Sequence, residues 1–261
     1  MKIFKAVIDS LVKYGIDTET VLSFVNFYRT HFNEKYTRLG IKVKPELQFS
    51  SGVSKKSINQ IEQFIEKHQI TLAKAEEIFG VQKEIIAIIL WVETKFGEVL
   101  GNHHLLSVFF SMAMTSGEPF LERHMVDILK DGANNISYDD IIQRARRKES
   151  YALQQLQALV EIQKRKYLDV RELYGSYAGA FGIPQFVPTS YLQFAIDGNG
   201  DKKIDLFDLE DAIFSVANYL HQNGWNRFDT SSFPKTLFKY NKDQQYVSTI
   251  MSIFHLIKSK Y

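Results

Sequence analysis

Glu93 is the side chain whose position points most directly to chemistry. It lies near the end of the stretch EIIAIILWVETKFGEVLGNH at 84–103, where the periodicity predicts a helix. At about 100° per residue, Glu93 shares the apolar face of this helix with Ile86, Ile89 and Leu90. Burial there would raise the pKa of the carboxyl, and a carboxyl that keeps its proton near neutral pH is suited to general acid catalysis. The alternative is a buried Glu satisfied by a hydroxyl or a backbone group.

A second candidate is the segment YGSYAGAFGIPQFVPTSY at 174–191, which is rich in Gly, Pro and aromatic residues. This composition predicts a tight and specific loop. Glycines let the backbone approach a ligand closely, and aromatic faces stack on sugar rings. Ser176 and Gln185 would then hydrogen-bond sugar substituents or a water. The alternative is a loop that only packs its aromatic side chains into a core.

A third candidate is the segment DGNGDKKIDLFD at 197–208, which matches much of an EF-hand calcium loop. Its ligands would be the side chains of Asp197, Asn199, Asp201 and Asp208 and the backbone carbonyl of Lys203. Lys202 stands where Gly is expected, and the last ligand is Asp in place of Glu, so the pattern predicts a weak or structural site. The alternative is a turn in which Asp and Asn bond their own backbone.

The composition excludes several other functions. The 261 residues carry a formal net charge of +2, which gives no argument for binding to nucleic acid. The absence of Cys excludes disulfides and thiolate metal sites. The His residues show no metal-ligand spacing, and no P-loop, nucleophile elbow or dinucleotide fingerprint is present. No stretch is apolar for long enough to span a membrane.

The elements that must position these residues are predicted to be helices. A helical pair is expected within 3–32, a connection at 35–52, and one long helix or two from 54 to Gly80. Further helices are expected at about 120–130, 138–148, 150–168, 211–224 and 243–258. We therefore predict an all-α protein with a boundary between 1–52 and 53–261, or one continuous globular unit.

The beginning of the chain, MKIFKAVIDSLVKYG, reads as an amphipathic helix. Asp9 and Lys13 stand where a signal peptide would have its apolar centre, so no export signal is expected in this chain.

Four segments together resemble a known family. VETKFGEVLGNH, the loop with the acidic segment after it, DAIFSVANYLHQNGW and KYN at 239–241 follow the order and spacing of the membrane-bound lytic transglycosylase B family, glycoside hydrolase family 103. The resemblance covers about residues 80–250. It implies a goose-lysozyme-like helical domain, here 53–261 after an N-terminal helical segment at 1–52, that cleaves the glycan strand of peptidoglycan.

The resemblance also implies roles for individual residues. Glu93 stands at the position of the sole catalytic acid. The residues that would bind the sugar or line its cleft are Ser176, Gln185, Tyr219, Tyr240, Asn241 and Tyr246. Asp197, Asn199, Asp201, Lys203 and Asp208 match the family's structural calcium loop, and catalysis needs no cofactor. The implied partner is the peptidoglycan strand, the implied location is the cell envelope or periplasm, and a monomer is expected.

Three departures from the family pattern are visible. The segment between Trp225 and Lys239 is too short for the small β-subdomain of larger relatives. The paired Arg found near the peptide stem in relatives is missing from MTSGEPFLERH, where Arg123 is the candidate substitute. The third departure is that no export signal is expected in this chain. The expected activity is non-hydrolytic cleavage between N-acetylmuramic acid and N-acetylglucosamine, and the alternatives are a hydrolytic lysozyme and a non-catalytic glycan-binding or structural envelope protein.

Overall fold

The structure is a computed structural model that describes residues 2–38, 54–118, 120–130 and 137–260. The chain forms two compact units, which we call unit 1 and unit 2. Unit 1 consists of residues 1–45, 101–181 and 186–192, and unit 2 of residues 46–100, 182–185 and 193–261. The predicted boundary between 52 and 53 lies outside the described residues and stays a prediction.

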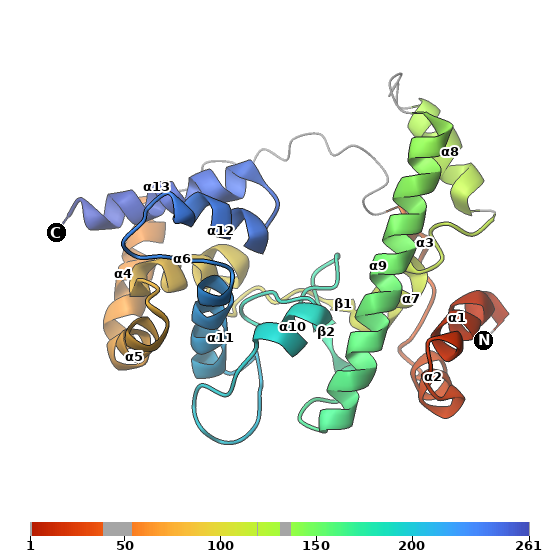
Figure 1. The fold of residues 1–261 in the computed structure, drawn as a ribbon, viewed down its shortest axis with the longest axis horizontal. Helices are drawn as coiled ribbons and strands as arrows, with labels where there is room; N and C mark the ends of the chain where they lie inside the picture. The colour runs from red at the N-terminus through yellow and green to blue at the C-terminus, as the bar shows by residue number, and fades with distance from the viewer. Residues whose placement is uncertain (1, 39–53, 119, 131–136, 261) are drawn as a thin grey trace. The chain divides into compact units, whose positions relative to one another are not determined.

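Unit 1 is built from helices and one small sheet (Figure 1). Its elements are η1 (Lys2–Phe4), α1 (Lys5–Lys13), α2 (Thr18–Val25), α3 (Glu34–Thr37), β1 (His103–His104), α7 (Leu105–Met112), α8 (Phe120–Lys130), α9 (Tyr138–Arg165), η2 (Val170–Glu172), β2 (Tyr174–Gly175) and most of α10 (Pro188–Phe194).

The core of unit 1 forms where the apolar helix α7 packs against α9 and α3. Every residue of α7 is buried. Helix α9, the long green helix of Figure 1, begins at a capping box formed by Ser137 and Asp140. The two separate helices predicted at 138–148 and 150–168 are wrong, because α9 runs unbroken to Arg165. No Gly or Pro interrupts it, and its buried stripe continues across Ser150.

A two-stranded antiparallel sheet leads into the glycine-rich loop of unit 1. His103 pairs with Gly175, and His104 pairs with Tyr174. The buried ring of His104 connects β1 to the chain just before β2, because its Nε2 donates to the Arg171 carbonyl at 2.8 Å. The sequence did not predict either strand, because two residues are too few to show an alternating pattern.

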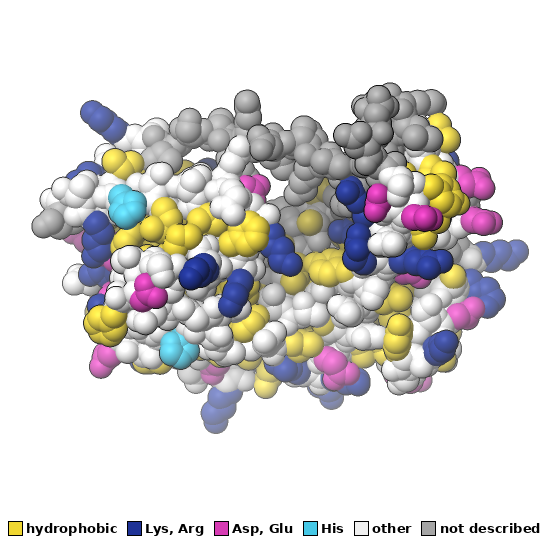
Figure 2. All heavy atoms as spheres, turned by 45° about the horizontal axis from the view of Figure 1, so that its top comes forward, with side chains coloured by type: hydrophobic (Ala, Val, Ile, Leu, Met, Phe, Trp, Pro, Cys, Tyr) yellow, Lys and Arg dark blue, Asp and Glu magenta, His cyan; other side chains and the backbone are white. Residues whose placement is uncertain are grey.

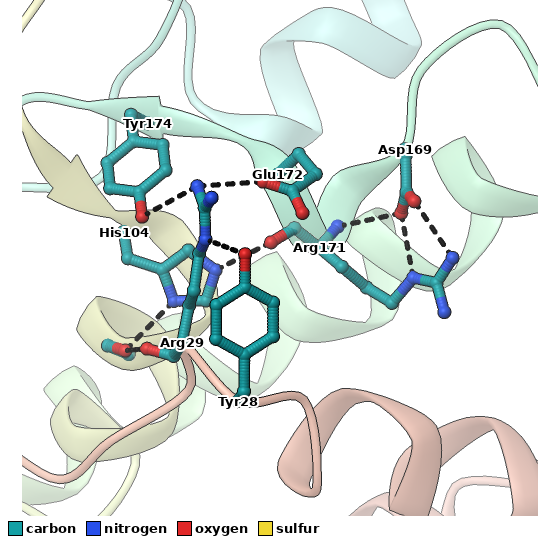
Figure 3. Close-up of polar contacts among 8 residues, drawn as sticks. Tyr28, Arg29, His104, Asp169, Arg171, Glu172 and Tyr174 are labelled. Atoms are coloured by element: carbon teal, nitrogen blue, oxygen red, sulfur yellow. Dashed lines mark hydrogen bonds and ion pairs between the residues drawn. The ribbon is translucent and has the colours of Figure 1, made fainter.

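Arg29 also holds the segment that leads into the glycine-rich loop, through Glu172 and Tyr174 (Figure 3). Its guanidinium pairs with the Glu172 carboxylate at 2.8 Å and donates to the Tyr174 hydroxyl at 3.3 Å. Nε donates to the Tyr28 hydroxyl at 2.5 Å. The chain after α2 is thereby tied to the residues that precede Ser176, so the loop starts from a fixed point.

Among the described residues of unit 2, the regular elements are all helices. Its helices are α4 (Lys55–Lys67), α5 (Gln69–Phe79), α6 (Lys83–Thr94), the end of α10, α11 (Leu209–Gln222), α12 (Ser232–Tyr240) and α13 (Gln244–Lys258). The helices predicted between 54 and Gly80 are α4 and α5, and Gly80 ends α5 with a φ of +67°. Helix α12 was not predicted.

Helix α6 is the centre of unit 2 and packs against α4, α5, α11 and α13. Its residues from Glu84 to Trp91 are all buried, so it is covered on every side. Sequence periodicity places Glu84 on the solvated side, and this is wrong. Glu84 is 8 % exposed and pairs with the Lys258 ammonium of α13 at 2.8 Å, which compensates its burial.

The all-α, lysozyme-like fold class is confirmed by the helices and by the solved structures described below. Lys and Arg side chains are interspersed with Asp and Glu on the visible face (Figure 2). This mixture agrees with the formal net charge of +2. No helix in the described part of the chain is both long and apolar enough to cross a membrane.

Candidate active site

Glu93 lies in the last turn of α6 and is half-buried. Its neighbours on the predicted apolar face, Ile86, Ile89 and Leu90, are completely buried. Burial raises the pKa of Glu93 from 4.5 to about 7, because surroundings of low dielectric constant disfavour the carboxylate. Both the protonated and the ionised form of Glu93 are therefore accessible near neutral pH.

The carboxyl of Glu93 interacts with the side chain of Tyr246. It makes no hydrogen bond of ordinary geometry to any residue that the structure describes. The hydroxyl of Tyr246 lies close enough to hydrogen-bond it in a less favourable geometry, and this interaction lowers its pKa by less than burial raises it. This hydroxyl is itself buried and without a partner of ordinary hydrogen-bond geometry among the described residues. The carboxyl and the hydroxyl together still have lone pairs and a proton to offer a ligand.

Three tyrosines surround this region of unit 2. The rings of Tyr219 and Tyr240 meet edge to face at 4.7 Å, and those of Tyr240 and Tyr246 are parallel at 6.3 Å. Burial raises the pKa of Tyr219 to about 12. Burial and the nearby Glu93 charge hold the pKa values of Tyr240 and Tyr246 well above 10. All three hydroxyls therefore keep their protons and remain donors at neutral pH.

Residues 182–185 form a strap that crosses into unit 2 beside the end of α6. The Thr94 hydroxyl, next to Glu93, donates to the Ile183 carbonyl at 2.8 Å. The Tyr240 hydroxyl donates to the Pro184 carbonyl at 2.6 Å. The strap therefore connects the helix that carries Glu93 to the tyrosine cluster, although neither connection is visible in the sequence.

Gln185 ends the strap with a φ of +54°, which is unusual for a residue other than Gly. Its side-chain nitrogen donates to the carbonyls of Gly182 at 3.0 Å and Leu100 at 3.3 Å. Since both partners are acceptors, the amide must turn its NH₂ group toward them. Its Oε1 then has no donor among the described residues and remains available to a ligand.

Asn241 follows α12 directly and is half-buried. Its backbone N–H donates to the Leu237 carbonyl at 3.0 Å, and its carbonyl accepts from Asp243 N–H at 2.7 Å. Its side-chain amide makes no hydrogen bond to the described residues. The backbone is thus fixed and the amide is open, which is the arrangement of a side chain that binds a ligand.

The sequence did not predict the unusual turn after Glu93. Lys95, Phe96 and Gly97 all have positive φ, of +51°, +61° and +99°. A left-handed backbone at two consecutive residues other than Gly is strained. Proteins keep such strain mainly at functional sites. Phe96 is held by stacking on Phe64 of α4 at 3.8 Å. The turn brings the chain sharply away from α6 just after the carboxyl.

Ser176 is part of unit 1, where the loop closes on itself. Its N–H donates to the Ala180 carbonyl at 2.7 Å, and its hydroxyl accepts from the Ala180 N–H at 3.1 Å. Gly175 contributes because a Cβ there would lie 2.0 Å from the Ala180 carbonyl oxygen. The role of Ser176 beside Glu93 stays a prediction, since the two residues belong to different units.

The acidic loop at 197–208 is closed by hydrogen bonds from its own backbone. Asp197 accepts from the N–H groups of Gly200 at 2.6 Å and Lys202 at 2.8 Å. Asn199 accepts from Asp201 N–H at 2.9 Å, and Asp201 accepts from Lys203 N–H at 2.8 Å. These bonds match the alternative in which the side chains form turns with their own backbone.

A residue that the sequence did not single out, Asp211 of α11, also holds this loop. It is 1 % exposed and accepts from Gly198 N–H and from Asp205 N–H, both at 2.7 Å. Burial raises the pKa of Asp211. Asp208, the last of the predicted ligands, caps α11 by accepting from the N–H groups of Glu210 and Asp211 at 2.9 and 3.2 Å.

The loop fits calcium by its donor chemistry. Oxygen is the ligand that Ca²⁺ takes, and each carboxylate offers about four lone-pair positions, of which these hydrogen bonds use one or two. However, no three acidic or His side chains of the described residues form a group close enough to hold a metal. Asn199 and the Lys203 carbonyl would therefore have to complete the set, together with water.

The chemistry available to the site follows from Glu93. One carboxyl with a pKa of about 7 can both give and take a proton near neutral pH. Among the described residues, the only side chain that shifts the pKa of Glu93 is Tyr246. A second carboxylate close to Glu93 would raise this pKa further. No carboxylate of the described residues does so. The site is thus arranged for proton transfer by a single acid.

The raised pKa of Glu93 predicts a pH-dependent stability. The folded state binds this proton more tightly than the unfolded state, so its contribution is complete below pH 4.5 and is lost as pH rises through about 7. Replacing Glu93 with Gln removes this dependence. We expect the variant to gain as much as about 2.5 kcal/mol over the natural chain between pH 5 and pH 8, and less where water screens the carboxyl. Urea unfolding at both pH values measures this, and an equal difference at both would contradict it.

Comparisons with known proteins show which family the chain resembles. The family model described as Transglycosylase SLT domain matches residues 3–252. Membrane-bound lytic murein transglycosylase B of Escherichia coli (strain K12) is 31 % identical over 166 residues, or 64 % of this chain. The chain spans only 38 % of the length of that relative.

Two solved structures share the fold. Soluble lytic transglycosylase SltB1 from Pseudomonas aeruginosa is 19 % identical with a TM-score of 0.74, over 96 % of each chain. The Escherichia coli lytic transglycosylase Slt35 in complex with calcium is 21 % identical with a TM-score of 0.73, over 96 % of this chain and 90 % of that one.

Proposed function

The chain belongs to the Transglycosylase SLT domain family, and on this premise we propose that it is a lytic transglycosylase of peptidoglycan with Glu93 as its only catalytic acid. The reaction is the non-hydrolytic cleavage of the β-1,4 bond between N-acetylmuramic acid and N-acetylglucosamine. The observation that supports it most is the Glu93 carboxyl, whose pKa is about 7 and on which no carboxylate of the described residues acts. Most glycosidases need two carboxylates, whereas a transglycosylase uses one residue twice.

In the first step, the protonated Glu93 gives its proton to the oxygen of the glycosidic bond. The bond from this oxygen to carbon 1 of the muramoyl residue breaks, and N-acetylglucosamine leaves with a free 4-hydroxyl. The positive charge on carbon 1 is shared with the ring oxygen or captured by the substrate's own 2-acetamido oxygen as an oxazolinium. Glu93 is now ionised, and the Tyr246 hydroxyl, which has no other partner among the described residues, donates to it.

In the second step, the Glu93 carboxylate removes the proton of the muramoyl 6-hydroxyl. The 6-oxygen attacks carbon 1, and the product carries a 1,6-anhydro ring. The proton of the 6-hydroxyl returns Glu93 to its protonated form, while the first proton stays on the 4-hydroxyl of the released N-acetylglucosamine, and no water is consumed. A pKa near 7 suits both steps because the residue must act first as an acid and then as a base.

The remaining residues hold the sugar. The free Oε1 of Gln185 and the open amide of Asn241 offer hydrogen bonds to hydroxyl and acetamido groups. Tyr219, Tyr240 and Tyr246 offer ring faces and position the strap and the carboxyl. We assign Ser176 to the same sugar-binding loop. Arg123 is not assigned to the peptide stem, since in the structure it pairs with the Glu34 carboxylate of α3 at 3.2 Å.

The product decides between this proposal and a hydrolytic lysozyme. We expect digestion of purified peptidoglycan to release muropeptides that end in 1,6-anhydromuramic acid, because the 6-hydroxyl and not water attacks carbon 1. Mass spectrometry distinguishes this product, which is about 18 Da lighter than the reducing sugar formed by hydrolysis. Reducing ends alone would make the enzyme a hydrolase, and no release of muropeptides would favour a non-catalytic glycan-binding protein.

We also propose that the loop at 197–208 binds Ca²⁺ as a structural ion outside the reaction. The donor set and the calcium complex of Slt35 support this. Calcium at ten times its Kd should stabilise the chain by about 1.4 kcal/mol, which raises Tm by a few degrees. Asp201→Asn should remove the effect because Asn keeps the oxygen that accepts from Lys203 N–H but loses the charge. Asp139→Asn on the exposed start of α9 is the control, and an equal rise of Tm in both variants would contradict the assignment.

The setting follows from the substrate. We place the protein in the cell envelope, in contact with peptidoglycan strands, and expect a monomer. The membrane-bound relative from Escherichia coli supports the envelope.

A further inference from the structure

A groove of about 570 Å³ in unit 1 has no role in the proposed reaction. It lies between the turn from α1 to α2, the C-terminal half of α9 and the start of α10. Its volume is within the range of about 300–1,000 Å³ that small-molecule sites occupy. Unit 1 does not contain Glu93, so this groove is not part of the site around that acid.

The α9 side of the groove presents two amides that make no hydrogen bond to the described residues. Gln154 and Gln157 are spaced three residues apart on one face of the helix and line the groove. Neither side chain makes a hydrogen bond to the described residues. Gln155, one position away, instead points inward and accepts from Thr189 N–H at 3.0 Å and from its hydroxyl at 3.1 Å. This bond fixes the start of α10, which forms the second wall.

The opposite side of the groove presents an aromatic face. Tyr14 ends α1 and is 63 % exposed. Its hydroxyl makes no hydrogen bond within the described residues. Gly15 follows with a φ of +86°, and nothing lies within 4 Å of the position of its missing Cβ. The tyrosine ring is therefore presented at an open turn, where a flat ligand can approach it.

The charges at the groove nearly cancel. The Lys164 ammonium pairs with the Glu161 carboxylate at 2.7 Å. Hydrogen bonds from Thr20 lower the pKa of Asp17, and Lys164 adds to this effect, so Lys164 also lies within electrostatic reach of Asp17. Two carboxylates and one ammonium leave a net charge of −1, which disfavours phosphates and other anions.

We propose that this groove is a second glycan-binding site, which holds a neutral N-acetylated amino sugar of the peptidoglycan strand. Primary amides both donate and accept, as do the hydroxyl and acetamido groups of such a sugar. The Tyr14 ring offers an apolar face for the C–H face of the pyranose ring. The identification of the ligand rests on the proposed function, whereas the groove and its free amides do not.

The surroundings favour a sugar over a peptide. One common mode of binding an extended peptide pairs its main chain with the edge of a sheet. The described elements at this groove are helices and a turn, which offer side chains and not a strand edge. A second site on a polymeric substrate raises the local concentration of the enzyme on the strand without any change at the acid.

Nuclear magnetic resonance of the full chain tests the proposal directly. The Glu93→Gln variant, which prevents turnover, is titrated with tri-N-acetylchitotriose, and the side-chain NH₂ signals of Gln154 and Gln157 are followed. We expect both to shift at millimolar sugar. Shifts of Gln185 and Asn241 without those of Gln154 and Gln157 would overturn this site and leave the proposed function intact. Shifts with a stem pentapeptide but not with the sugar would overturn the ligand class.

Sedimentation with purified peptidoglycan gives a second readout. The Gln154→Ala, Gln157→Ala double variant should bind sacculi about 10-fold more weakly, with unchanged turnover of a short soluble glycan. Both residues are on a helix surface, where Ala is well tolerated. Gln143→Ala, on an exposed position of the same helix, is the matched control. Equal binding by the double variant and the control would overturn the proposal.

Discussion

The Glu93→Gln variant is expected to lose at least about 10³-fold of its turnover on peptidoglycan. Glutamine keeps the size of the side chain but cannot carry the proton that both steps require. General acid and general base catalysis each contribute about 10²–10⁴-fold, and here one residue supplies both. Turbidity of a sacculus suspension measures the rate, and the yield of anhydromuropeptides confirms that the same reaction is followed.

The matched control is Glu98→Gln, which makes the same replacement at an exposed residue five positions further along the chain. We expect it to keep full turnover. Circular dichroism and the urea midpoint should show that Glu93→Gln folds as well as the natural chain, or better above pH 7, because burial raises the pKa of Glu93 to about 7. Residual turnover within 10-fold of the natural chain would show that another group supplies the proton.

The local part of the site could be predicted from the sequence. The spacing of Ile86, Ile89 and Leu90 shows that Glu93 falls in an apolar stripe, because helical geometry relates residues a few positions apart. The resulting rise in the pKa of Glu93 agrees with the structure. The end of α5 at Gly80 was predictable for the same reason, since a left-handed C-cap is a local feature.

The distant part of the site was not predictable from periodicity. The bond from Thr94 to the Ile183 carbonyl joins residues 89 positions apart, and that from Tyr240 to the Pro184 carbonyl joins residues 56 apart. Such pairings depend on tertiary packing. Periodicity is read in a sequence window of about 11–18 residues and cannot show contacts between residues further apart. The burial of Glu84 beside Lys258 has the same cause, since α13 covers a side of α6 that the pattern left to solvent.

Gly182 has no room for a side chain, so we expect its replacement by Ala to have a large effect on stability. Its φ is +74°, and a Cβ there would lie 2.5 Å from the Leu206 Cβ and 2.9 Å from the Leu206 carbonyl oxygen. The same carbonyl accepts from Ile183 N–H at 2.8 Å. The strap is thus pressed against the acidic loop, and Gly182→Ala must push the two apart.

We expect Gly182→Ala to lower the free energy of unfolding by about 2–5 kcal/mol, of which about 1–2 come from the left-handed backbone and the rest from overpacking. Gly80→Ala separates the two contributions, since Gly80 also has a positive φ, of +67°, but nothing within 4 Å of its Cβ position. It should cost only about 1–2 kcal/mol. Urea unfolding of both variants measures the difference, and equal losses would show that the strap tolerates the side chain.

The same pair of variants links the strap to catalysis. Where enough Gly182→Ala folds to be assayed, its turnover should fall about 10²-fold, because a displaced strap moves Gln185 and the Pro184 carbonyl that holds Tyr240. Gly80→Ala lies at the end of α5 and should keep its turnover once the folded fraction is taken into account. A folded Gly182→Ala protein with full turnover would mean that the bonds to Thr94 and Tyr240 stabilise unit 2 without positioning the acid. The catalytic requirement would then reduce to Glu93 and the tyrosine beside it.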